Sequence, residues 1–579
     1  MRRLAALVLA CAFALPLQAL ELRAIRIDGL DPVLEANVRA HLSIEKLDPE
    51  RRARLTETRL SYYLRAAPDE VQEGLEPFGY YDAEAEAAIE RDGDAVTVVL
   101  VVKPGEPVRV RELALSVQGP AHEDGDVAML LTSFHPKPGE AMHHGDYETG
   151  KLAITRRLEE RGYFDAELLK HRVEVTRAEH AADIALAWLS GERYGFGDVM
   201  FEGHPFRPGL LEKLVPWKPG DPFDQAQLLR LQTSLTDLDY FAGISLLPET
   251  EKKADGRVPI RVSLTPAKRS VYRAGLSYGS DSGAGIDLGL ERRWLNARGH
   301  KMLLSLGLAE EKSHFTAEYR IPAFAWLDGW YGIGLAARRE RINDIDTEYA
   351  DASFTRSGRW RDWNLLAGLN YRRERFDSLT KIVPQNEFVS LTFLSLSAER
   401  RWFDDPVTPR DGKKLALDLR GGPGGLGSDL GFMQLHAEAK YIRGLGEGNR
   451  LLLRGELGTT ITDDFDLFPP SLRFYAGGDH SVRGYGYKAI GERVGRINYG
   501  GKHLAVASVE FERMFTPAWG GAVFVDVGDA YTDKFDAKKG VGLGLRWRSP
   551  VGPVRVDLAR GLDGPEKGLR LHISIGPDL

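Results

Sequence analysis

Hydrophobic and polar positions follow two different periods along the chain, and the change falls near residue 268. Before it, apolar residues recur with the spacing of amphipathic helices, between short strand-like runs. After it, segments of about eight to twelve residues alternate with period two, between turns rich in glycine, asparagine, aspartate and proline. The pattern predicts an α+β region over 20–267 and an all-β region over 268–579.

The α+β region repeats one pattern about every 80 to 90 residues, which indicates copies of a single supersecondary unit. Each copy opens with a short strand that ends at a glycine, continues with helical periodicity and closes with strands. The order β-α-α-β-β fits all three copies, with bounds 20–105, 106–190 and 191–267.

A related aromatic motif follows the second predicted helix of each copy. It reads Gly79-Tyr80-Tyr81-Asp82 in the first copy, Gly162-Tyr163-Phe164-Asp165 in the second, and a weaker Asp239-Tyr240-Phe241 in the third. The glycine suits a helix C-cap, after which the aromatic rings can fill the space between helix and sheet. We therefore expect core packing from these rings.

The period-two region contains sixteen candidate strands, such as the run in which Leu415, Leu417 and Leu419 alternate with polar or small residues. An even number of strands brings both ends of the sheet to the same side. Eight of the ten tryptophans lie in this region, mostly near predicted strand ends, as in an interfacial girdle. These features favour a transmembrane antiparallel β-barrel of sixteen strands over a soluble sandwich.

The first nineteen residues carry Arg2 and Arg3, then an apolar run, then Leu17-Gln18-Ala19. This pattern predicts a secretory signal peptide over 1–19; a lipoprotein signal ending at Cys11 is the weaker alternative, since the apolar run continues past it. Cys11 is the only cysteine, so we expect neither disulfides nor a thiolate metal site. The formal net charge of -7 does not indicate a nucleic-acid partner, and no motif predicts a cofactor.

The gap between the eleventh and twelfth predicted strands, about 461–501, is too long for a hairpin. It contains Phe474-Tyr475-Ala476-Gly477-Gly478-Asp479-His480-Ser481 followed by Val482-Arg483-Gly484-Tyr485. This segment closely resembles the inserted-loop signature of the BamA/TamA superfamily of outer-membrane assembly barrels. Phe524, Asp526 and Gly528 resemble a second family motif, on a later strand.

The resemblance implies that the inserted loop folds back into the barrel lumen and that Arg483 meets Asp526, near Phe524. A buried arginine needs a partner, and a carboxylate can accept its paired donors. The N-terminal units resemble polypeptide-transport-associated (POTRA) domains, and three of them before sixteen strands resemble the TamA branch of the superfamily. The implied place is the outer membrane of a Gram-negative bacterium, with the POTRA domains in the periplasm.

The implied function is assembly or secretion of β-barrel and autotransporter clients through a lateral gate, together with a TamB-like partner anchored in the inner membrane. The gate would be the seam between the first and last strands, where glycine weakens strand pairing. Its predicted residues are Tyr272, Gly275, Leu276 and Tyr278 in the first strand, and Gly568, Leu571, Ile573 and Ile575 in the last.

Other functions fit less well. A two-partner secretion transporter or a lipid-transport pore of the same superfamily is the nearest alternative, and a passive porin is more remote because it needs no repeated N-terminal units. An enzyme is not expected: the adjacent Asp479, His480 and Ser481 cannot readily adopt triad geometry. His135, His143 and His144 match no familiar metal-ligand spacing.

Overall fold

The computed structural model describes residues 20–579 apart from residues 94, 280–282, 325–327, 343–344, 379–384, 406, 496, 550–551, 564–567 and 576–579. The predicted signal peptide and Trp326 lie outside the described residues. No helix in the described part is long and apolar enough to cross a membrane.

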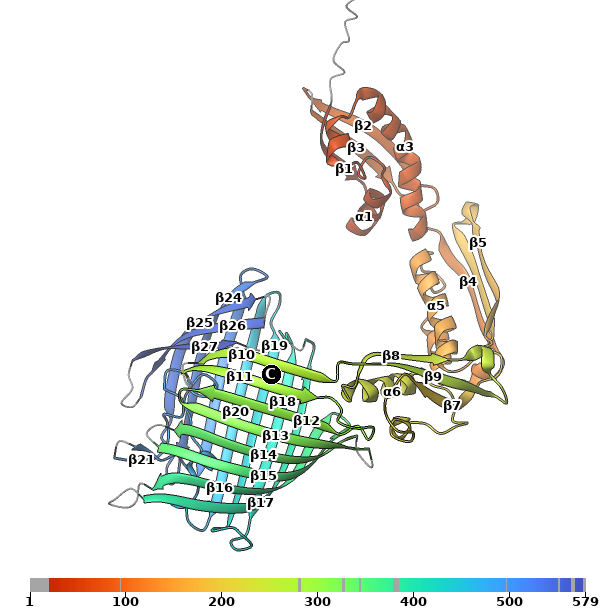
Figure 1. Ribbon diagram of the computed structural model, residues 1–579. Coiled ribbons are helices and arrows are strands. Elements are labelled where there is room, and N and C mark those ends of the chain that lie inside the picture. The colour runs from red at the N-terminus through yellow and green to blue at the C-terminus, as the bar shows by residue number, and fades with distance from the viewer. Residues whose placement is uncertain are drawn as a thin grey trace, which may run out of the picture. The chain divides into compact units, whose positions relative to one another are not determined.

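The C-terminal region is a single antiparallel sheet of sixteen strands, in which each strand pairs with its neighbours in chain order (Figure 1). The sixteen predicted segments all appear, and several extend by a few residues at each end. The strands are β10 (Ser270–Gly279), β11 (Gly283–Arg292), β12 (Lys301–Ala309), β13 (Lys312–Ala323), β14 (Gly329–Ile342), β15 (Ile345–Trp360), β16 (Trp363–Ser378), β17 (Gln385–Phe403), β18 (Gly412–Gly422), β19 (Phe432–Gly444), β20 (Asn449–Thr462), β23 (His503–Met514), β24 (Trp519–Tyr531), β25 (Lys538–Ser549), β26 (Gly552–Gly561) and β27 (Leu569–Ile575).

The two faces of this sheet reverse the usual distribution of polarity. On β14 the outward side chains of Tyr331, Ile333 and Leu335 are 42%, 50% and 59% exposed. On β23 the inward side chains of Glu510 and Glu512 are buried. Apolar side chains outside and charged side chains inside are what a transmembrane barrel requires, because its exterior contacts hydrocarbon.

The barrel tryptophans that the structure describes gather at one end. The chain enters the barrel at the start of β10, and we call this end, where the N-terminal units are attached, the near end. Because the strands are antiparallel, each strand runs in the opposite direction to the one before it. The described tryptophans within strands lie at the starts of strands that run away from the N-terminal units and at the ends of strands that run back toward them. Both positions are at the near end. The predicted girdle is therefore one-sided, and its members within strands are Trp330, Trp360, Trp363, Trp402, Trp519 and Trp547.

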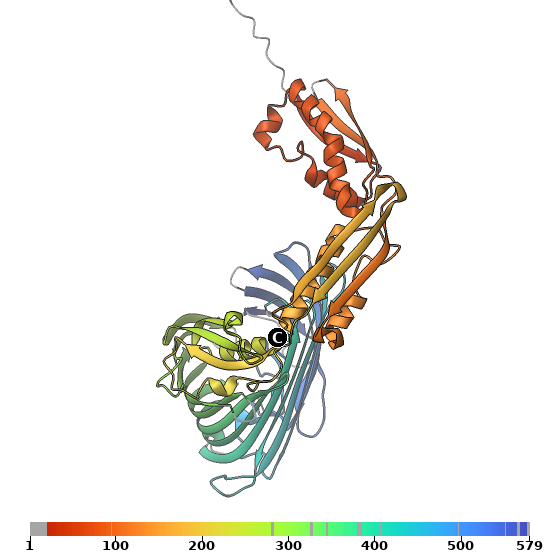
Figure 2. The same ribbon diagram turned by 90° about the vertical axis from the view of Figure 1, so that its right-hand side faces the viewer.

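The N-terminal region forms three units, each with a three-stranded sheet in which the first and last strands are adjacent (Figures 1 and 2). The first and last strands run parallel in the first two units. The first unit contains β1 (Glu21–Asp28), α1 (Pro32–His41), α2 (Pro49–Ala53), α3 (Glu57–Leu75), η1 (Glu76–Phe78), β2 (Glu84–Asp92) and β3 (Ala95–Lys103). The second contains β4 (Arg109–Gln118), η2 (Pro120–Glu123), α4 (Gly125–Thr132), α5 (His144–Glu160), β5 (Glu167–Thr176), η3 (Arg177–Glu179) and β6 (Ala181–Leu189).

The third unit contains β7 (Gly195–Glu202), η4 (Glu212–Leu214), α6 (Gln225–Asp237), β8 (Phe241–Pro248), η5 (Thr250–Lys252) and β9 (Arg257–Pro266). Here the first expected helix is only the short 3-10 turn η4. Pro205, Pro208 and Pro216 surround that turn, and proline inside a helix removes a backbone hydrogen bond. The helical periodicity of this segment therefore predicted a helix where only a short turn forms.

The aromatic motifs only partly follow the expectation of core packing. Tyr163 is buried in the core of the second unit, and Tyr80 packs on that of the first. The aromatic residue that follows instead reaches the next unit. The hydroxyl oxygen of Tyr81 lies 2.6 Å from Nε2 of His144, and the ring centres of Phe164 and Phe223 are 4.8 Å apart. In the first two units each pair thus joins one ring to its own core and the other to the next unit.

Candidate functional site

The segment between β20 and β23 folds back into the barrel and makes contact with strands on several sides of the lumen. It carries the turn η6 (Pro470–Leu472) and the short hairpin of β21 (Arg493–Val494) and β22 (Ile497–Asn498). Ser471 hydrogen-bonds Glu374 of β16, and Nζ of Lys488 lies 3.1 Å from Glu340 of β14. The long gap in the sequence is therefore an internal structure of the barrel.

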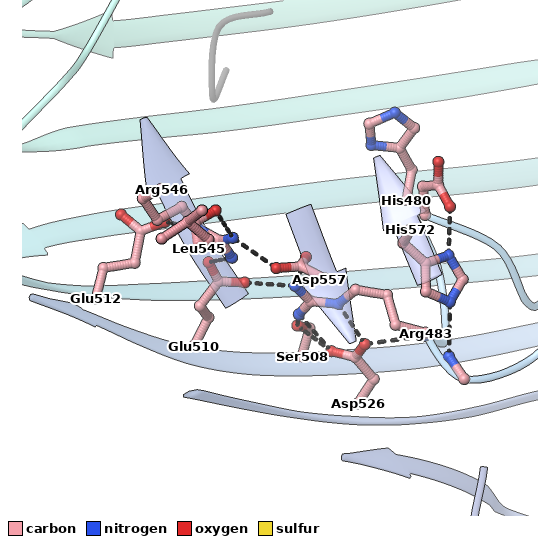
Figure 3. Close-up of polar contacts among 12 residues, drawn as sticks. His480, Arg483, Ser508, Glu510, Glu512, Asp526, Leu545, Arg546, Asp557 and His572 are labelled. Atoms are coloured by element: carbon pink, nitrogen blue, oxygen red, sulfur yellow. Dashed lines mark hydrogen bonds and ion pairs between the residues drawn. The ribbon is translucent and has the colours of Figure 1, made fainter. Parts of the chain in front are cut away.

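Arg483 is the centre of this segment's contacts with the C-terminal strands (Figure 3). Its Nε and Nη2 donate to the two carboxylate oxygens of Asp526 at 2.8 and 3.0 Å, and its backbone N–H donates to the same carboxylate at 3.0 Å. Nη1 reaches Glu510 at 2.7 Å and Asp557 at 3.0 Å. The guanidinium also lies 3.4 Å from the ring centre of Phe524, so both its edge and its face are occupied.

A second arginine, Arg546 of β25, continues the network (Figure 3). It donates to Glu510 and Asp557 at 2.5 Å each, and to Glu512 at 2.6 Å. Glu510 and Asp557 therefore each bridge two guanidinium groups. Because these groups are buried, each charge needs its partners, and loss of one member leaves others uncompensated.

The residues beside Arg483 fix the loop to the last strands. The backbone N–H of Gly484 donates to Nε2 of His572 in β27 at 3.0 Å, and Nδ1 of His572 contacts Asp479. The hydroxyl of Tyr485 donates to the backbone oxygen of Asp563 at 2.7 Å, and Val482 is fully buried. All four residues of the predicted loop motif thus make contacts inside the barrel.

Two glycines permit the close approach of the loop to the strands. Gly484 has a φ of +93°, and a Cβ there would lie 2.5 Å from the backbone nitrogen of Gly561. At Gly540 a Cβ would lie 1.9 Å from the backbone oxygen of Arg483. Gly528 packs instead on the neighbouring strand, where a Cβ would lie 2.8 Å from the backbone oxygen of Ala505 in β23. The loop and the strands therefore pack backbone to backbone at Gly484 and Gly540.

Sequence reasoning placed Arg483 with Asp526 and Phe524, and the structure brings these residues together. It missed Glu510, Asp557, Arg546 and His572, which complete the network. The available signal was alternation: each of these side chains lies at a polar position between outward apolar residues. Period two gives the face of a strand, but it does not say which residues on different strands share a height.

The predicted seam residues lie on the end strands of the sheet order. β10 pairs with β11 and β27 with β26, and no ladder joins β10 to β27 among the described residues. Tyr272 and Leu276 are 76% and 88% exposed. Leu571 and Ile573 also face outward, while Gly275 has open space at its Cβ position and Gly568 precedes β27. Tyr278 and Ile575 belong to these strands, but their side chains lie outside the described part.

Comparison with protein families matches this architecture. Residues 295–578 match the model of the Omp85 superfamily domain, 24–104 match "POTRA domain TamA domain 1", and 194–267 match a POTRA model described as a surface antigen variable number repeat. Residues 295–578 are an Omp85 superfamily domain, and POTRA domains precede it. The chain therefore combines the two parts that the sequence resemblance implied.

Two similar proteins carry the name BamA. The outer membrane protein assembly factor BamA of Nitratidesulfovibrio vulgaris is 23% identical over 524 residues, which cover 86% of this chain and 66% of that protein. The crystal structure of BamA from Haemophilus ducreyi lacking POTRA domains 1–3 is similar with a TM-score of 0.67 at 16% identity, covering 81% of this chain and 99% of that one. This second likeness shows the fold.

The POTRA and Omp85 parts also settle the location and orientation. The barrel lies in the outer membrane of a Gram-negative bacterium, and the POTRA domains lie in the periplasm. The near end of the barrel, where the tryptophans gather, is then the periplasmic end. The hairpins β12–β13, β14–β15 and β16–β17 turn at the opposite, outer end.

Proposed function

We propose that this protein assembles or secretes outer-membrane proteins by offering the edges of β10 and β27 to incoming client strands. The observation that carries the proposal is that no ladder joins these two end strands of the sixteen-stranded sheet among their described residues. An unpaired strand edge presents backbone donors and acceptors that can pair with another chain. Such pairing would form client strands without exposing their backbone to hydrocarbon.

The inserted loop supports this proposal from inside the barrel. The loop contacts β14, β16 and each of the last five strands, β23 to β27. Its contact with β27 is the hydrogen bond from Gly484 to His572. One side of the seam is therefore anchored to the loop. We infer a rigid C-terminal edge and a β10 edge that can move away from it.

Locking the seam tests the gate. The sequence after residue 19 contains no cysteine, so Leu276→Cys and Leu571→Cys can be joined by a short crosslinker with a reducible arm. Insertion of a barrel client by the protein in proteoliposomes should fall to background in the crosslinked form and return on reduction, because the edges cannot separate while joined.

A matched control crosslinks two strands that are already paired. Leu543 of β25 and Leu558 of β26 are register partners that both face outward. Crosslinking Leu543→Cys to Leu558→Cys should leave client insertion unchanged. Full insertion activity with the β10–β27 pair joined would rule out the gate.

We further propose a TamA-type role with a TamB-like partner anchored in the inner membrane. The match of 24–104 to a TamA first POTRA domain and the presence of three units before the barrel support this assignment. The docking element would be β2, an edge strand of the first unit whose Glu86 and Ala88 are exposed. An edge strand can be extended by a strand of a partner.

Site-specific photocrosslinking in cells tests this docking. A photoreactive residue at Ala88 in β2 should capture a TamB-like protein, because strand addition would bring the partner against that edge. The same residue at Asp69, exposed on α3, should capture it at least tenfold less. Equal capture at both positions, or capture at neither, would contradict docking on β2.

The other functions make different predictions. A two-partner secretion transporter would handle one dedicated secreted protein, and a lipid-transport pore would change lipid distribution without changing barrel proteins. A passive porin would give large, steady conductance in planar bilayers. Deleting the gene and comparing the outer-membrane proteome separates these cases, since loss of several barrel or autotransporter proteins is expected only from an assembly role.

A further inference from the structure

The outer surface of the barrel changes from apolar to basic toward the outer ends of β14 and β16, the two strands that flank β15. On β14 the outward residues Tyr331, Ile333 and Leu335 are followed by Ala337 and then Arg339. On β16 the outward Leu369 and Tyr371 are followed by Arg373 and Arg375. These arginines lie near the outer ends of their strands, so they belong to the headgroup level of the outer leaflet.

Register places the charges side by side. Arg339 of β14 is opposite Glu348 of β15, which is in turn opposite Arg375 of β16. The ion pair of Glu348 is with Arg339, at 3.6 Å. Among the side chains that the structure describes, no carboxylate forms an ion pair with Arg373 or Arg375, and both are exposed. The patch therefore carries more positive than negative charge.

These arginines line a surface depression of about 530 Å³. Its lining includes Leu308, Phe315 and Phe388, which are 52%, 45% and 56% exposed, together with Arg339, Arg373 and Arg375. The guanidinium of Arg373 lies 5.0 Å from the ring centre of Phe388, which holds it at the rim. Basic and apolar side chains thus line the same depression on the outer face of the barrel.

From this arrangement we infer that the depression binds a phosphorylated glycolipid of the outer leaflet, whose phosphate groups contact Arg373 and Arg375 and whose acyl chains lie on Leu308 and Phe315. Guanidinium groups bind phosphate through paired charge-assisted hydrogen bonds. The lipid anchor of lipopolysaccharide, an acylated disaccharide with two phosphates, has both required parts. This site is separate from the seam and from the inserted loop.

Equilibrium binding of that lipid anchor to the purified full-length protein in detergent tests the inference. The wild-type protein should bind the form with two phosphates at least tenfold more tightly than the same acylated disaccharide without phosphate. Arg373→Gln combined with Arg375→Gln should weaken binding about tenfold, since each lost charge-assisted contact contributes. The double lysine variant should lose about threefold, because it keeps the charge but not the paired donors.

The control removes two arginines from the periplasmic end of β17. Arg400→Gln combined with Arg401→Gln should leave the affinity within twofold of wild type. Heat-modifiable migration on a gel shows that each variant is folded. The inference fails if the phosphate-free lipid binds equally, if the 373/375 variant stays within twofold of wild type, or if phosphatidylglycerol binds as tightly as the glycolipid.

Discussion

Replacing Arg483 by alanine should destabilise the barrel by about 3 to 5 kcal/mol, the cost of leaving buried charges without their partner. Asp526 is fully buried and would lose both of its bonds to the guanidinium, while Glu510 and Asp557 would each lose a contact. Loss of folded protein in heat-modifiable migration, and a lower urea midpoint in detergent, measure the effect.

Two further variants show whether the geometry of Arg483 matters beyond its charge. Arg483→Lys keeps a cation but cannot reach Asp526, Glu510 and Asp557 together, so it should recover only part of the lost stability. Arg493→Ala, in the same loop, removes an exposed arginine whose side chain contacts the backbone of Ala489. It should unfold with the wild-type midpoint. Equal midpoints for Arg483→Ala and Arg493→Ala would show that the buried network contributes little.

The sheet was largely predictable because its exterior and interior impose opposite chemistry on alternate residues. Leu415, Leu417 and Leu419 lie on one outward face of β18, as the alternation indicated. The third POTRA unit was harder: prolines convert its first helix into a short turn although the apolar spacing is helical. Local backbone restrictions there override periodicity.

The candidate site was less accessible to sequence reasoning. Arg483 and Asp526 were paired through the family resemblance, since they are 43 residues apart and no local pattern links them. Ser508 lies opposite Asp526 in register, so the β23–β24 hairpin brings these two residues together. Asp557 and His572 lie on later strands, and their heights depend on the accumulated register of each hairpin. The sequence alone does not give this cumulative register.

Adding one methyl group at Gly540 should displace the inserted loop as effectively as removing Arg483. A Cβ at position 540 would lie 1.9 Å from the backbone oxygen of Arg483. The clash is with backbone rather than with a flexible side chain, so it cannot be relieved by a change of rotamer. Gly540→Ala should therefore expose the loop to added protease and lower the urea midpoint by a comparable amount.

Gly484→Ala tests the same contact from the side of the loop. Its φ of +93° disfavours any side chain, and its Cβ would lie 2.5 Å from the nitrogen of Gly561. Gly455→Ala in β20 is the matched control, because nothing lies within 4 Å of a Cβ there. If both Gly540→Ala and Gly484→Ala resist protease as Gly455→Ala does, the loop is not held by close backbone packing. If they release the loop while Arg483 remains present, then shape and charge both anchor it, and the ion pairs alone are insufficient.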